Sequence, residues 1–312
     1  MKRFSLLIVA AALFGVAFVG VIGMRRDMTL KQARSGFVSK LIPQSREKTP
    51  VPASPSKRFH VVAYDSPKGK LAAYASIDPN DGKRHPVIIW ISGGDSHSID
   101  ASFWEDQDIS NDQSAKQYRE AGLLMMYPSL RGGNDNPGEP EGFLGEADDV
   151  VAAADYLAKL SYVDPNRIYL GGHSTGGTLV LLSAELSSKF RAVFAFGPVD
   201  DIGGYGSDSG FTPFDASNSK ERELRSPGLW LSSIKCPVFV FEGEDGGNID
   251  SLQAMKRASK NPLIRFSSVE GASHFCILGP VNRVIANKIL GDTGNRMNIQ
   301  FSRESLNRLF LK

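Results

Sequence analysis

The chain has 312 residues, of which 41% are hydrophobic and 22% charged, and its 36 basic and 34 acidic side chains leave a formal net charge of +2. Because Lys and Arg are scattered among nearly equal numbers of acids, this composition excludes the basic face typical of a nucleic-acid-binding protein. The two cysteines, Cys236 and Cys276, follow no Cys-x-x-Cys spacing, so the sequence predicts free thiols and no metal site.

Residues 1–26 form an apolar segment with basic residues at both ends, and the apolar run extends from Phe4 to Met24. A helix needs about 20 apolar residues to cross a bilayer, whereas the core of a cleavable signal peptide has about 7 to 15. The length therefore favours an uncleaved membrane anchor, with cleavage after Gly23 or a buried soluble helix as alternatives. A short cationic tail before such a run favours a membrane-anchored or exported protein, with the domain that follows outside the cytoplasm.

Two further regions follow this segment. Residues 27–56 are polar and end in a proline-rich stretch, which predicts an extended tether with little core. From residue 57 to residue 312, strand-like and helix-like segments alternate, for example at 87–91, 123–127 and 146–160. Such alternation predicts one domain with a mostly parallel central sheet and helices on both faces.

Ser174 lies in the sequence Gly-Gly-His-Ser-Thr-Gly-Gly, residues 171–177, between strand-like residues 167–170 and helix-like residues 178–184. This is the pattern of a nucleophile elbow, in which glycines permit a sharp, strained turn that exposes the serine hydroxyl. The motif alone is weak evidence in a chain with 31 glycines. The strand before it and the helix after it make Ser174 the candidate nucleophile.

His274 is the candidate catalytic base. In the fold that uses this elbow, the partners follow in the order serine, acid, histidine. Of the five histidines, His274 is the one that follows Ser174. It lies in a turn-rich stretch directly after strand-like residues 264–268, where a loop can bring an imidazole across the sheet.

The acid must lie between these two residues. The apolar segment 237–241 predicts a buried parallel strand, and carboxylates follow at its carboxyl end. Asp245 is the first choice to orient the His274 ring and to stabilise its charged form. Three other carboxylates remain open as alternatives: Glu242, Glu244 and the more distant Asp200.

Acyl transfer also requires donors for a developing oxyanion. In this fold they are the backbone N–H that follows the nucleophile and one from the loop after an earlier strand. The first prediction is Thr175. The second is Gly94, with Asp95 next, because residues 92–95 follow the strand-like segment 87–91.

Several motifs carry a family resemblance. They are Tyr-Pro-Ser-Leu-Arg-Gly-Gly at 127–133, Gly-Glu-Ala-Asp-Asp-Val at 145–150, Tyr-Val-Asp-Pro-Asn-Arg-Ile at 162–168 and the elbow itself. The sequence resembles the α/β-hydrolase superfamily, and over about residues 85–290 it is similar to the catalytic domain of the prolyl oligopeptidase family. The resemblance implies an α/β-hydrolase fold and a serine peptidase or esterase activity. Thr175 stands where those peptidases usually have tyrosine, and the short tether leaves no room for their propeller domain.

These features together predict a serine hydrolase that forms an acyl-enzyme on Ser174, with small esters or short peptides as substrates and no cofactor or metal. The alternative is a catalytically silent α/β-hydrolase scaffold that binds a ligand or a partner protein. The long connection 198–231 is interpreted as a lid over the acyl or leaving-group pocket, with a plain surface loop as the alternative.

Overall fold

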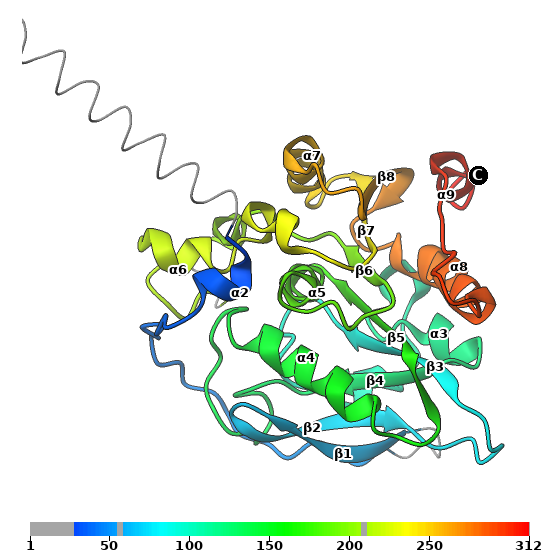
Figure 1. Ribbon diagram of the computed structural model, residues 1–312, viewed down its shortest axis with the longest axis horizontal. Helices are drawn as coiled ribbons and strands as arrows, with labels where there is room; N and C mark the ends of the chain where they lie inside the picture. Colours follow the sequence, from blue (N-terminus) through cyan, green and yellow to red (C-terminus); the bar gives the residue numbers. More distant parts are fainter. Residues whose placement is uncertain (1–27, 55–58, 207–210, 312) are drawn as a thin grey trace, which may run out of the picture.

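A single mixed sheet forms the centre of the protein. The computed structural model describes residues 28–54, 59–206 and 211–311, and its sheet has eight strands in the order β1-β2-β4-β3-β5-β6-β7-β8 (Figure 1). The strands are β1 Phe59–Ser66, β2 Gly69–Ser76, β3 His85–Ile91, β4 Leu124–Pro128, β5 Val163–His173, β6 Val193–Phe196, β7 Val238–Asp245 and β8 Ile264–Ser273. The β1–β2 and β2–β4 pairs are antiparallel, and the pairs from β4 to β8 are parallel, which confirms the predicted mostly parallel sheet.

Helices cover both faces of this sheet (Figure 1). They are α2 Leu30–Ala33, α3 Lys116–Glu120, α4 Glu146–Leu157, α5 Thr175–Leu186, α6 Ser219–Glu223, α7 Ile249–Ala258, α8 Leu278–Gly291 and α9 Arg303–Asn307. Successive side chains of a strand point to opposite faces. Val87 and Ile89 of β3 therefore pack in the layer of α4 and α5, whereas Ile88 and Trp90 pack in the layer of α3 and α8. The core consequently forms two apolar layers, one on each side of the sheet.

The anchor or signal helix predicted for residues 1–26 lies outside the described residues. In the parts of the chain that the structure describes, no helix combines the length and the apolar character needed to cross a membrane.

The segment predicted as a tether, residues 27–56, lies against the domain over its described part, 28–54. Leu30 in α2 is only 1% exposed, and Leu41 forms an isolated antiparallel bridge with Phe214. The prediction of little core is therefore wrong for this segment. Its polar composition does not indicate these contacts, because they are made with residues far along the chain, such as Phe214.

Glu185, in α5, is a buried carboxyl group, and neither of its oxygens has a hydrogen-bond partner among the described residues. Burial raises its pKa well above the ordinary value of a glutamate. The folded protein therefore holds a proton here at pH values at which the unfolded chain has lost it, so the free energy of unfolding falls as pH rises above about 4.5.

Glu185→Gln removes this titration and should stabilise the protein at neutral pH. We expect the variant to have a free energy of unfolding higher than wild type by about 1 to 3 kcal/mol at pH 7, with the difference approaching zero near pH 4. Urea denaturation at the two pH values measures it, and the exposed Glu139→Gln is the matched control. An equal difference at both pH values would contradict the burial of an ionisable group without a partner.

Candidate active site

Ser174 lies at the sharp turn between β5 and α5. Its backbone has φ +54° and ψ −113°, a conformation that strains any residue with a side chain. Glycines make the turn possible, because a Cβ atom on Gly172 would lie 2.5 Å from the carbonyl oxygen of Gly176 and one on Gly176 would lie 2.3 Å from that of Ile91. The strand–turn–helix expected from the motif is thus present. Among the described residues, the hydroxyl of the half-buried Ser174 makes no hydrogen bond.

The imidazole of His274 lies beside this turn. The backbone N–H of Ser174 donates to the carbonyl oxygen of Phe196 at 2.7 Å. The next residue, Gly197, has φ +55°, and a Cβ atom there would lie 2.4 Å from Cε1 of His274. A Cβ atom on Gly247 would lie 2.7 Å from Cβ of His274. Gly197 and Gly247 therefore make room for the ring. Gly197 directly follows Phe196, whose carbonyl oxygen accepts the hydrogen bond from Ser174.

Glu242 supplies the carboxylate that meets this ring. Its Oε2 lies 2.9 Å from Nδ1 of His274. The side chain is fully buried and also accepts hydrogen bonds from the N–H groups of Gly243, at 2.8 Å, and Asn248, at 3.0 Å. A carboxylate that accepts several hydrogen bonds is held in one orientation, so His274 Nδ1 carries the proton and Nε2 is left as the acceptor.

The prediction of Asp245 for this position is corrected by the structure. Asp245 is exposed at the end of β7, where it pairs with Ser273 of β8, and no hydrogen bond in the described chain joins it to His274. The strand continues past Glu242, and its register with β8 shifts between Gly243 and Asp245. The carboxylate at the ring therefore comes from inside the strand rather than from the turn after it.

The other two carboxylates that the sequence left open are engaged elsewhere. Glu244 pairs with Arg303 at 3.2 Å, and Asp200 accepts a hydrogen bond from Ser251 at 2.7 Å. The sequence left Glu242 open as an alternative to Asp245, and its place directly after the apolar residues 237–241 is the signal that could have identified it.

The residues predicted as oxyanion donors lie next to one another. The side-chain hydroxyl of Thr175 donates to the carbonyl oxygen of Gly94 at 2.8 Å, so the loop after β3 is fastened to the first residue of α5. Within the described residues, no hydrogen bond uses the backbone N–H of Thr175 or of Gly94. The N–H of Gly93, in contrast, donates to Gln113 Oε1 at 2.9 Å. Thr175 and Gly94 therefore retain two free donors on one side of the elbow.

A chain of hydrogen bonds joins this loop to the loop of His274. Gln113 accepts from Gly93, and its side-chain amide lies 3.0 Å from Nδ1 of His173. The other nitrogen of His173, Nε2, donates to the carbonyl oxygen of His274 at 2.9 Å. Burial, followed by the charge of His274, lowers the pKa of His173 to about 3. His173 is therefore a neutral linker, with Nδ1 accepting and Nε2 donating.

His97 forms a second polar cluster beside the same loop. Its Nδ1 lies 3.1 Å from Asp95 and its Nε2 lies 3.0 Å from Glu146 at the start of α4. Burial by itself lowers the pKa of His97, but the hydrogen bonds and charges of the two carboxylates outweigh burial and raise that pKa to about 9. Contact with the imidazolium also lowers the pKa of Glu146 to about 2, against the effect of burial. At neutral pH the cluster consists of one cation between two anions.

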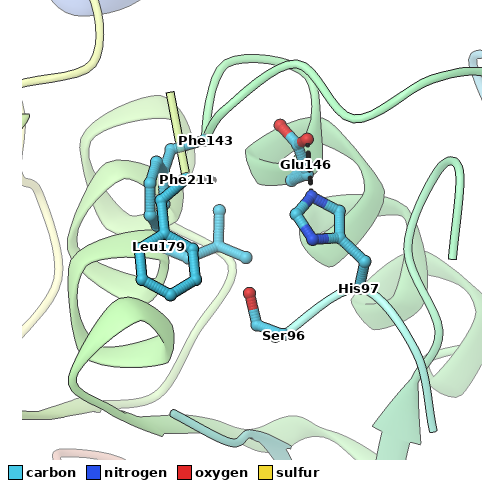
Figure 2. A pocket seen from close by; sticks show the side chains of 6 residues that line it. All are labelled: Ser96, His97, Phe143, Glu146, Leu179 and Phe211. Atoms are coloured by element: carbon cyan, nitrogen blue, oxygen red, sulfur yellow. Dashed lines mark hydrogen bonds and ion pairs between the residues drawn. The ribbon is translucent and has the colours of Figure 1, made fainter. Parts of the chain in front are cut away.

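A small pocket adjoins this cluster (Figure 2). It has room for about one water molecule and is lined by Ser96, His97, Phe143, Glu146, Leu179 and Phe211. Figure 2 shows the aromatic rings and Leu179 on one side, opposite His97 and the Ser96 hydroxyl. Leu179 belongs to the elbow helix, and Ser96 follows the Gly94 loop by two residues, so the pocket lies between the two parts that carry the candidate nucleophile and oxyanion donors.

A family model matches the middle of the chain. Residues 110–261 match the model described as the prolyl oligopeptidase family. This part of the chain, just under half of its length, is therefore similar to that family. The matched part includes Ser174 and Glu242, and His274 follows it.

Curated relatives match parts of the chain at low identity. Dipeptidyl-peptidase 5 of Porphyromonas endodontalis is 25% identical over 192 residues, which cover 55% of this chain and 27% of the relative. A probable dipeptidyl-aminopeptidase B of Aspergillus terreus is 29% identical over 160 residues, or 48% of this chain and 17% of the relative. The matched part thus spans 27% and 17% of the length of these two relatives.

Solved structures support the α/β-hydrolase-like fold. Dipeptidyl peptidase 4 of Porphyromonas gingivalis aligns with a TM-score of 0.60 at 21% identity, over 75% of this chain and 35% of that one. An esterase of Pyrobaculum calidifontis aligns with a TM-score of 0.55 at 17% identity, over 75% of this chain and 85% of that one. The same fold therefore serves peptidases and an esterase among these neighbours.

His97→Gln should destabilise the protein in a pH-dependent manner. Because the folded state raises the pKa of His97 to about 9, the charged ring contributes stability that is complete below its unfolded pKa and is lost as pH rises through about 9. We expect the wild type to exceed the variant by roughly 2 to 3 kcal/mol near pH 6.5 and by much less at pH 9.5. Urea denaturation at both pH values tests this, with the exposed His60→Gln as control. A difference that does not change with pH would contradict the assignment of a charged His97.

Proposed function

We propose that this protein is a serine hydrolase that acts through an acyl-enzyme on Ser174. The observation that carries the proposal is the 2.9 Å hydrogen bond between His274 Nδ1 and the buried carboxylate of Glu242. His274 lies in a loop beside the strained Ser174. Because Glu242 occupies Nδ1, Nε2 of His274 is able to accept a proton. Nucleophile, orienting acid and base, at residues 174, 242 and 274, then follow one another in the chain order typical of this elbow.

The first half of the reaction forms the acyl-enzyme. The Ser174 hydroxyl oxygen attacks the substrate carbonyl carbon while its proton moves to Nε2 of His274. Glu242 stabilises the imidazolium through the Nδ1–H bond. The backbone N–H groups of Thr175 and Gly94 donate to the oxyanion that develops on the carbonyl oxygen. His274 then gives its proton to the leaving alcohol or amine as the bond between that group and the acyl carbon breaks.

The second half of the reaction repeats these roles with water. His274 accepts a proton from water, the hydroxyl attacks the acyl carbon, and the proton returns to the Ser174 oxygen as the product acid leaves. These steps need neither a metal nor an organic cofactor. Relatives named dipeptidyl-peptidase and dipeptidyl-aminopeptidase, together with a neighbour named esterase, support short peptides or esters as the substrate class.

Ser174→Ala tests whether Ser174 is the nucleophile. We expect a fluorophosphonate probe to label the wild-type protein and to leave the variant unlabelled, because the probe forms a covalent bond with an activated serine oxygen. Gel fluorescence measures the labelling, and Ser183→Ala, elsewhere on α5, is the control. Equal labelling of wild type and Ser174→Ala, or no labelling of either, would favour the alternative of a catalytically silent scaffold.

The acid is tested by a matched pair of substitutions. Glu242→Gln keeps the shape of the side chain but removes the charge that stabilises the imidazolium, so we expect kcat to fall by about 100- to 10,000-fold. Asp245→Asn, three residues further along β7, should change kcat by less than about 3-fold, since surface substitutions have small effects. Chromogenic esters and aminoacyl amides supply the rates. The reverse ranking would return the acid role to Asp245.

A further inference from the structure

Residues 39–46, which we call the strap, connect α2 to the side of the molecule that carries β1 and β2 (blue in Figure 1). The strap has no regular secondary structure apart from one bridge residue, yet it contacts three separate parts of the domain. Two of the contacts hold residues next to Phe211, which lines the pocket in Figure 2. The third holds the loop that carries Gly94.

The first contact is a buried ion pair that needs the strap for its remaining hydrogen bonds. Glu221 and Arg225 are 2% and 0% exposed and lie 2.5 Å apart. Glu221 also accepts from the Ser39 hydroxyl at 2.9 Å and from the Lys40 N–H at 2.8 Å, and Arg225 donates to the Ser39 hydroxyl at 2.7 Å. A buried charge that loses its hydrogen-bond partners destabilises the folded protein. The pair is therefore satisfied only while the strap is in place.

The second contact holds a segment within the long connection after β6. Leu41 forms its bridge with Phe214, and the Ile42 N–H donates to the Pro213 carbonyl oxygen at 2.7 Å. The guanidinium of Arg225 lies 4.0 Å from the centroid of the Phe214 ring. Phe214 is thus held by the strap on its backbone and by a cation on its ring face.

Phe211 carries this contact to the pocket. Phe211, three residues before Phe214, lines the pocket together with Phe143. Gly142, directly before Phe143, lies against the same segment: a Cβ atom there would lie 2.7 Å from the Phe214 ring and 3.0 Å from the Phe211 carbonyl oxygen. Tyr205 packs against both aromatic walls, with ring centroids 5.7 Å from Phe143 and 5.5 Å from Phe211. Phe214 and Phe211 are therefore packed closely against the same neighbours, so a shift of Phe214 is expected to displace Phe211 as well.

The third contact lies at the other end of the strap. Arg46 pairs with Asp95 at 3.2 Å, one residue after Gly94 and beside His97. Because Asp95 is about half exposed, this pair contributes at most a modest stabilisation. Its effect is positional, since it ties the strap to the loop that carries a candidate oxyanion donor.

We propose that the strap is a specificity-determining element: by holding Phe214, and through it Phe211, it keeps the pocket beside the elbow narrow and restricts the enzyme to substrates with small acyl groups. This inference rests on the proposed serine hydrolase function. The pocket has room for about one water molecule, far below the range of about 300 to 1,000 Å³ that is usual for ligand pockets. A short acyl group on Ser174 does not need this space, whereas a long one can enter it only if the Phe211 wall moves.

Ile42→Pro tests the proposal. Proline lacks the N–H that bonds to Pro213, and residue 42 directly precedes Pro43, a position that favours the extended backbone that proline adopts. Ile42→Ala is the matched control, because it keeps the N–H and changes only a side chain that is 54% exposed. We expect the ratio of kcat/KM for p-nitrophenyl octanoate to that for the acetate to rise about 10-fold in Ile42→Pro and to stay within about 2-fold of wild type in Ile42→Ala.

Hydrogen exchange of residues 211–214 is measured in parallel on the same proteins. Faster exchange in Ile42→Pro together with the higher ratio supports the proposal. Faster exchange with an unchanged ratio overturns it, because the wall is then loosened without effect on selectivity, and unchanged exchange with an unchanged ratio overturns it as well. Fluorophosphonate labelling of wild-type Ser174 separates these outcomes from a failure of the proposed function. If the wild type is labelled but the ratio does not respond to Ile42→Pro, the role of the strap is rejected and the serine hydrolase function stands.

Discussion

The strained backbone of Ser174 is the constraint on which the rest of the site depends. A positive φ at a residue with a side chain persists only where its surroundings fix it, and here β5, α5 and the β3 strand end meet so closely that only glycine fits at 172 and 176. That close approach brings the Gly94 loop to Thr175 and brings Phe196, with Gly197 after it, to the elbow. The arrangement of candidate nucleophile, donors and base is therefore a consequence of backbone packing.

Two polar systems keep this arrangement fixed, and both start in the loop after β3. One runs through Gln113 and the neutral His173 to the carbonyl oxygen of His274. The other runs from Asp95 through the charged His97 to Glu146. Buried polar groups are stable only when their partners are complete, so each system ties the loop to an element that is distant in sequence. The strap adds a third tie, through Arg46.

The fold and most of the candidate site could be predicted from the sequence because their signals are local. The alternation of strands and helices, the elbow at Ser174 and the place of His274 after β8 depend on neighbouring residues and chain order. The acid could not be fixed in this way. Glu242 and Asp245 are three residues apart, and the choice between them depends on a register shift against β8 and on which side chain is buried.

The sequence by itself determined the layered sheet, the serine at a glycine-rich turn and the order in which its partners follow, since periodicity and glycine content constrain the backbone directly. Tertiary structure decided which carboxylate meets the imidazole and that residues 28–54 pack against the domain. Both depend on contacts between residues far apart in the chain, where a buried group such as Glu221 or the His274 ring selects its partner by distance and burial. Local composition carries no record of those contacts.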